Sequence, residues 1–127
     1  MKKEKLVLIL HSVFGFLSVG LGAFGTHGLR EKLSPKYYEV WKTANEYNFY
    51  HSISGILAVI LFLYAKENKF FYGSIAFVLG NILFSGSLYF LAITEIKFLG
   101  IITPFGGVLF LIGWFFLILG STKISLK

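Results

Sequence analysis

Two histidines, His27 and His51, are the side chains in this sequence most suited to chemistry, and each lies within a long stretch without Lys, Arg, Asp or Glu. An imidazole can ligate a metal or haem, relay a proton or hydrogen-bond a neighbouring helix. The chain has no Cys or Asp and no two histidines four residues apart, so only Glu46 or Glu95 could complete a metal site. We therefore rank structural hydrogen bonding above proton or ligand handling, and metal or haem binding last, with no cofactor expected.

The triplet Ser85-Gly86-Ser87 is a second pattern that could do chemistry, as the nucleophile of a serine hydrolase. Catalysis would need a base within hydrogen-bonding reach of the hydroxyl and an oxyanion hole. Small residues at a close contact between two helices explain the triplet equally well. The sequence therefore favours a protein that is not an enzyme.

Four uncharged segments must position these residues, and each is about as long as a bilayer is thick. A helix needs roughly 20 apolar residues to cross a hydrocarbon core of about 30 Å. Four such helices and their connections use residues 1–127, which we interpret as one domain. The predicted fold class is all-α integral membrane, an antiparallel four-helix transmembrane bundle. The segments are Leu6–Leu29, Tyr47–Ala65, Phe70–Thr94 and Phe98–Thr122.

The composition also indicates a membrane protein, because 56% of the 127 residues are hydrophobic, 14% are charged and the mean hydropathy is +0.75. A soluble domain of this length could not bury so much apolar surface. The net charge of +6 comes from lysines that flank the spans, so we expect membrane lipids rather than nucleic acid as partners. Seven Lys and Arg residues lie on the side of the termini and five on the other side, which favours a cell-membrane protein with cytoplasmic termini.

Two Ser/Thr-Pro pairs predict where helices begin. Ser34-Pro35 has the form of an N-cap followed by proline in the first helical position. No helix breaker follows, so we predict one helix that begins at Pro35, at the membrane surface, and runs on through the second span. Thr103-Pro104 likewise predicts that the last helix begins at Pro104, after an apolar connection at 98–102. The other predicted boundaries are Lys5 and Gly25–Gly28 for the first helix, and a tight turn at 66–69.

Small residues recur on one face of three predicted helices, at spacings of three, four or seven. Such faces let helices approach closely in lipid. We therefore predict that these faces pack against other helices, in this chain or in a neighbouring one. The pattern favours a helix-packing module that acts as a homo-oligomer or as an accessory subunit of a membrane-protein partner. The residues are Gly15, Ser18, Gly22 and Gly25, then Gly73 and Gly80, then Gly106 and Gly113.

Polar residues gather at one end of the predicted bundle, on the side of the 29–46 connection. His27 ends the first span and His51 lies near the start of the second, so we expect the two rings to share a depth and to approach each other. His11 is 16 residues before His27 and is expected near the opposite face. Because polar groups in lipid need partners, at least one of the two rings should hydrogen-bond a polar side chain at this end. The candidates are Asn48, Ser85, Ser87, Tyr89 and Thr103.

The same residues support two alternative functions. With Asn81 near the middle of the third span, His27, His51 and Asn48 could line a polar path through a small oligomeric transporter or channel. Bound to a metal or haem, the histidines would instead make a redox or metal protein.

Four short motifs stand in order along nearly the whole chain. They are Gly22–Leu29, Trp41–Ala44 with Tyr50-His51, Phe84–Tyr89, and Ile102–Gly107 with Gly113-Trp114. Together they resemble domain-of-unknown-function family 423, a family of small four-span membrane proteins. The resemblance implies a multi-pass membrane protein and supplies no activity. In the predicted topology all four motifs lie toward the side of the 29–46 connection.

Overall fold

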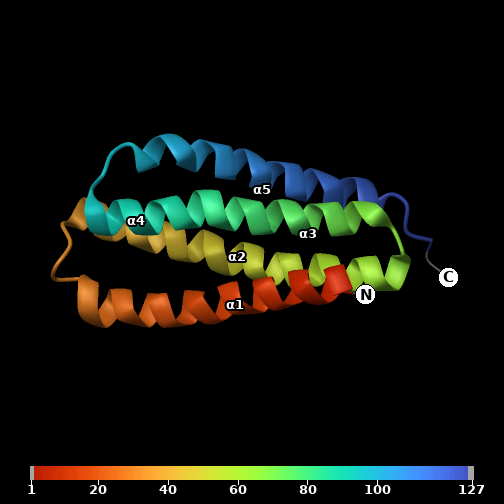
Figure 1. The fold of residues 1–127 in the computed structure, drawn as a ribbon, viewed down its shortest axis with the longest axis horizontal. Helices are drawn as coiled ribbons and strands as arrows, with labels where there is room; N and C mark the ends of the chain where they lie inside the picture. Colours follow the sequence, from red (N-terminus) through yellow and green to blue (C-terminus); the bar gives the residue numbers. More distant parts are fainter. Residues whose placement is uncertain (1, 126–127) are drawn as a thin grey trace.

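The computed structural model describes residues 2–125, and every regular element in this part of the chain is a helix. The helices form four antiparallel spans, each long and apolar enough to cross a membrane (Figure 1). The prediction of an all-α, four-span membrane protein is confirmed. The spans are Lys2–Leu29, Pro35–Ala65, Asn68–Thr94 and Leu99–Ser121.

Two of the spans contain a π-helical segment, in which the backbone turn is wider than in an α-helix. The first span is α1 (Lys2–Phe24) followed by η1 (Gly25–Leu29), and the second is α2 (Pro35–Ala65). The third is α3 (Asn68–Gly80), η2 (Asn81–Gly86) and α4 (Ser87–Thr94), and the fourth is α5 (Leu99–Ser121). Short π-helical segments inside α-helices occur frequently at functional sites.

The predicted start of the first helix is wrong, and its end lies one residue beyond the predicted Gly25–Gly28 region. The helix begins at Lys2 rather than after Lys5, and η1 carries it through Gly25–Gly28 to Leu29. The charged N-terminal residues can continue the helix because they lie at its end, where water or headgroups can solvate them. The glycines do not end the helix because none of them adopts the positive φ of a glycine C-cap.

The second and third spans form the centre of the bundle, and the first and fourth flank them. Figure 1 shows α2 between α1 and the α3–α4 span, with α5 on the far side of α3 and α4. Buried residues make up 39% and 44% of the most apolar windows of the two central spans, against 17% in each flanking span. Much of α1 and α5 therefore faces lipid. An apolar core joins α1, α2 and α3 near the termini, and it contains Val7, Val59, Phe62, Phe70, Phe71 and Val78.

The start of α2 agrees with its sequence signal. Ser34 is the N-cap, its Oγ accepts a hydrogen bond from the Tyr37 backbone N–H at 3.3 Å, and Pro35 is the first helical residue. The predicted turn at 66–69 is also present: Lys66 ends α2 with a φ of 58°, and Glu67 caps α3. These local signals fix α2 and α3 as antiparallel neighbours.

The predicted start of the last helix at Pro104 is wrong, because α5 begins at Leu99 and contains Pro104 in its second turn. The segment 98–102 is therefore mostly helix rather than a connection. Proline lacks the N–H that would bond the carbonyl four residues earlier, here that of Gly100, and membrane helices tolerate such a gap where neighbouring helices hold the turn. Thr103 Oγ1 and Ser87 Oγ hydrogen-bond each other at 2.6 Å, which ties this turn to α4.

Three glycines of α5 each pack against a phenylalanine of the third span. A Cβ added at Gly113 would lie 2.4 Å from the ring of Phe77, and one at Gly120 would lie 3.0 Å from the ring of Phe70. At Gly106 the added Cβ would meet the backbone nitrogen of Phe84 at 2.3 Å. The phenylalanines recur every seven residues, as do the glycines, so the two antiparallel helices interlock along their length.

Small residues on α1 face α2 in the same way. Gly22 and Gly25 lie against the side chains of Asn45 and Trp41, which a Cβ would approach to 2.7 and 2.4 Å. The indole of Trp41 also donates to the Leu21 carbonyl at 3.1 Å. The structure thus places the small-residue faces of the sequence against helices of the same chain.

Candidate functional site

His11 joins three helices near the middle of the bundle. Its ring is fully buried, and Nε2 lies 3.1 Å from the Ser74 carbonyl oxygen and 2.9 Å from Ser74 Oγ. A carbonyl oxygen only accepts, so Nε2 carries the proton and donates. Ser74 Oγ in turn donates to the Gly55 carbonyl at 3.0 Å, and no side chain at Gly55 competes with the imidazole. These bonds connect α1, α3 and α2.

His51 lies on α2 one turn before Gly55 and contacts α5. Its Nδ1 donates to the Tyr47 carbonyl at 2.8 Å, and its Nε2 accepts from the indole N–H of Trp114 at 3.0 Å. The ring stacks on Phe110 with centroids 3.6 Å apart. The two bonds fix the neutral tautomer, because a carbonyl can only accept and an indole N–H can only donate.

The Trp114→Phe substitution should reveal the contribution of this bond, because it keeps an aromatic ring and leaves His51 Nε2 unpaired. We expect a loss of about 1 kcal/mol, the usual scale of interhelical hydrogen bonds in membranes. Thermal denaturation of the purified protein in detergent measures the change. The control is Tyr64→Phe, which removes a polar atom from a side chain that is 75% exposed and should leave the midpoint unchanged. An equal effect of both variants would count against the bond.

The predicted approach of His27 to His51 is wrong. His27 is exposed on η1, beside Arg30 and Lys32, whereas His51 is buried against α5. The physical reason is the early start of α2: His51 is 16 residues beyond Pro35, or about 24 Å along the helix. His11 is also 16 residues from His27 along the first span. His11, and not His27, therefore lies at the depth of His51. The predicted bond between a histidine and the polar cluster is also wrong, since His51 bonds Tyr47 and Trp114.

Of the other predicted polar residues, Asn48 of α2 and Tyr89 of α4 bond each other, and Ser87 of α4 bonds Thr103 of α5. Asn48 Nδ2 donates to the Tyr89 hydroxyl at 3.3 Å, and that hydroxyl donates to Asn45 Oδ1 at 2.5 Å. Ser18 of α1 donates to the Asn45 carbonyl at 3.2 Å, and Ser52 donates to the Asn48 carbonyl at 2.6 Å. This chain of hydrogen bonds holds α1, α2 and α4 together at the end of the bundle away from the termini.

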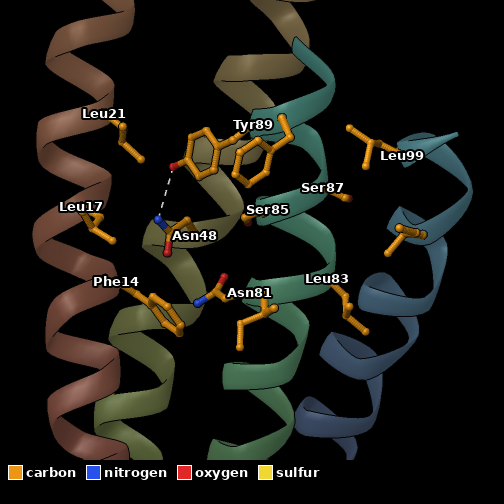
Figure 2. Close-up of a pocket in the computed structure, with 14 residues that line it drawn as sticks. Phe14, Leu17, Leu21, Asn48, Asn81, Leu83, Ser85, Ser87, Tyr89 and Leu99 are labelled. Carbon is orange, nitrogen blue, oxygen red and sulfur yellow. Dashed lines mark hydrogen bonds between the residues drawn. The ribbon is translucent and has the colours of Figure 1, made fainter. Parts of the chain in front are cut away.

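A cavity of about 390 Å³ lies over η2 and the start of α4, and we call it the η2 pocket (Figure 2). Figure 2 shows α1 on one side of it, α5 on the other, and α2 behind. The pocket forms where the apolar core joining α1 to α3 has ended. Its lining includes Phe14, Leu17, Leu21, Asn48, Asn81, Leu83, Ser85, Ser87, Tyr89 and Leu99.

Two polar side chains of η2 line this pocket without a partner. Both amide atoms of Asn81 and the hydroxyl of Ser85 are buried and have no hydrogen-bond partner within residues 2–125. Asn81 is 4% exposed and Ser85 is 1% exposed. A buried polar group without a hydrogen bond costs about 1–3 kcal/mol, so two such residues at one cavity need a functional explanation. Figure 2 shows the Asn81 amide directed toward the space between η2 and α1.

The chemistry available at the η2 pocket is hydrogen bonding by uncharged groups. Its lining contains no Lys, Arg, Asp, Glu or His. Within residues 2–125 no group of three His, Cys, Asp or Glu side chains could hold a metal ion. In the same range none of the histidine rings hydrogen-bonds Ser85 or Ser87, and the Ser87 hydroxyl is engaged with Thr103 and the Phe84 carbonyl.

Several residues that the structure makes important are not among the predicted site residues. Ser74, Asn45 and Trp114 are partners of polar groups, and only a known helix pairing would have revealed them. The sequence predicts the depth of Asn81 but not its place beside Ser85. The spacing of four between these residues was a usable signal, since it places both on one side of a helix.

Comparison with known proteins identifies a family. The family model described as "Protein of unknown function (DUF423)" matches residues 21–107. A UPF0382 membrane protein of Staphylococcus saprophyticus is 46% identical over 121 residues, which cover 94% of this chain and 99% of that protein. The UPF0382 membrane protein YwdK of Bacillus subtilis is 43% identical over 124 residues, with 94% and 98% covered. No solved structure matches the chain significantly. The chain therefore belongs to the DUF423/UPF0382 family of multi-pass membrane proteins.

Proposed function

We propose that this chain is a non-enzymatic membrane protein that binds a lipid-soluble molecule in the η2 pocket. The observation that carries the proposal is the pair of buried, unpartnered polar side chains, Asn81 and Ser85, in a cavity with otherwise mostly apolar walls. Binding sites for small molecules have this form, with a few placed polar groups in an apolar pocket of about 300–1,000 Å³. The protein would lie in the cell membrane with cytoplasmic termini, as its flanking lysines favour.

The position of the pocket supports entry from the bilayer rather than from water. Its edges include exposed apolar side chains from three elements, namely Leu17 of α1, Ile82 of η2 and Phe90 of α4. These side chains lie within membrane-spanning helices, where the surrounding medium is lipid. A molecule dissolved in the hydrocarbon could therefore reach Asn81 by moving sideways between the helices.

Two observations favour ligand binding over a hydrolase and over an oligomer built on the small-residue faces. A hydrolase would need a base beside Ser85 or Ser87, and the buried histidines are engaged with Ser74, Tyr47 and Trp114 instead. An oligomer built on the small-residue faces would need those faces free, and Gly25, Gly106 and Gly113 already contact helices of this chain. The unpartnered polar groups of the η2 pocket are not explained by packing within residues 2–125.

The Gly86→Leu substitution tests the proposal by filling the pocket. Gly86 lines the cavity, and an added Cβ would have its nearest contact at 3.8 Å, an ordinary distance, so the helix should tolerate the leucine. We expect native mass spectrometry of the wild-type protein to show a retained small molecule after gentle detergent extraction, and Gly86→Leu to lose it.

The matched control is Gly20→Leu, since nothing lies within 4 Å of an added Cβ at Gly20 on α1. This variant should retain the molecule as the wild type does. The proposal fails if the wild type carries no molecule, or if Gly86→Leu carries as much as Gly20→Leu.

A further inference from the structure

The depth of the unpartnered groups restricts the charge of the ligand. Asn81 is 13 residues from each end of the third span, Asn68–Thr94, which places it about 20 Å from either end. A charge at the centre of a bilayer is costly unless a partner neutralises it. The η2 pocket offers no charged side chain for that purpose. This restriction on the ligand rests on the proposed function, and it excludes lipids that would bring a phosphate or an ammonium group to Asn81.

The donors and acceptors at the site restrict the chemical group further. The Asn81 amide offers a donor and an acceptor, and the Ser85 hydroxyl can do either. An ester, ketone or ether only accepts, so it would leave Asn81 Oδ1 buried and unpaired. A hydroxyl both donates and accepts, so one hydroxyl complements an amide and a serine together.

The walls of the pocket restrict the rest of the molecule. From Asn81 the lining continues over eight residues to Tyr89, and Leu17, Leu21 and Leu99 flank this stretch. Eight helical residues span about 12 Å, so the cavity is elongated along the bundle. An apolar chain fits such walls better than a second polar group does.

From these three observations we infer that the η2 pocket takes an uncharged lipid alcohol, with its hydroxyl at Asn81 and Ser85 and its hydrocarbon chain along α1 and α4. The chain can be straight or isoprenoid, since both sources present the same hydroxyl on an apolar tail. The hydroxyl satisfies the amide and serine that the protein leaves unpaired, and no covalent step is involved.

Photolabelling of the full chain in phosphatidylcholine nanodiscs tests this inference. The probes are three diazirine-bearing molecules with one common C16 chain, which end in a hydroxyl, a methyl ester or a sulfonate. We expect the hydroxyl probe to label peptides that line the η2 pocket about tenfold more than the other two. In Asn81→Leu this preference should fall to about twofold or less, and Ser54→Ala, which alters a hydroxyl bonded within α2, should keep it.

The possible results separate the inference from the proposed function. If the ester or sulfonate probe labels the pocket as well as the alcohol does, the inference is wrong and the binding function stands. If no probe labels the pocket above the lipid-facing surface of α5, both are wrong. Should Asn81→Leu fail to fold, Ser85→Ala takes its place, and an unchanged preference in that variant overturns the inference.

Discussion

The Gly106→Ala substitution is expected to separate α5 from η2, with a loss of stability of about 3 kcal/mol or more. The added methyl carbon would lie 2.3 Å from the backbone nitrogen and 2.7 Å from the Cα of Phe84. A side chain can change rotamer to relieve such a contact, but here the backbone of a helix must move, and overpacking of a tight interface typically costs 1–3 kcal/mol, occasionally more. Thermal unfolding of the purified protein in one detergent should show a clearly lower midpoint.

The neighbouring residue supplies the control for this prediction. At Gly107 the same methyl group would have its nearest contact with the Phe84 ring at 3.7 Å, an ordinary van der Waals distance. Gly107→Ala should therefore leave the stability nearly unchanged, although it changes helix propensity as much as Gly106→Ala does. Equal midpoints for the two variants would contradict the close approach of α5 to η2.

The His11→Ala substitution is expected to cost about 2–4 kcal/mol, because it combines a cavity with lost hydrogen bonds. The ring is fully buried and lies against Gly55, where it occupies the space of the missing side chain. Without the imidazole, Ser74 loses a donor, and α1 loses its polar connection to α3. Denaturation of the variant in detergent or bicelles, followed by helical circular dichroism, measures the loss.

Ser12→Ala is the matched control for His11→Ala, since Ser12 is the next residue on α1 and is exposed. Its hydroxyl bonds the Leu8 carbonyl of its own helix at 2.9 Å, so its removal should change stability by a few tenths of a kcal/mol at most. If His11→Ala were as mild as this control, the three-helix connection through Ser74 would not be a stabilising contact.

The sequence was sufficient for the spans and for the start of α2, because both depend on local chemistry. Span length follows from the thickness of the bilayer, and the Ser34 cap needs only residues within one turn. The predicted depth of His51 was wrong for an avoidable reason. The uncharged stretch begins at Tyr47, but the helix begins at Pro35, and depth must be counted from the helix.

Contacts between helices were harder to predict, since they depend on which helices lie side by side. The glycines of α5 were evident, yet their seven-residue spacing gained its meaning only beside Phe70, Phe77 and Phe84. The proline signal at Thr103-Pro104 failed because a hydrogen bond between Thr103 and Ser87 of α4 holds this turn of α5 in place. Local sequence cannot show that a hydroxyl on another helix will be present.

The η2 pocket lay beyond sequence reasoning for a similar reason. Asn81 and Ser85 were visible as polar residues in an apolar span, and polar residues in membranes usually find partners. That their partners are missing depends on how η2 packs against the other helices, which leaves a cavity beside them.

The central claim is that Asn81 serves a ligand rather than the fold, and the Asn81→Leu variant tests it most directly. Leucine has nearly the same volume and removes an unpaired amide, so the delipidated variant should be at least as stable as the wild type, by up to about 2 kcal/mol. The same variant should lose the small molecule that native mass spectrometry detects with the wild-type protein. A variant that unfolds more easily than the wild type, yet keeps the bound molecule, would show that Asn81 is a structural residue and would contradict the account.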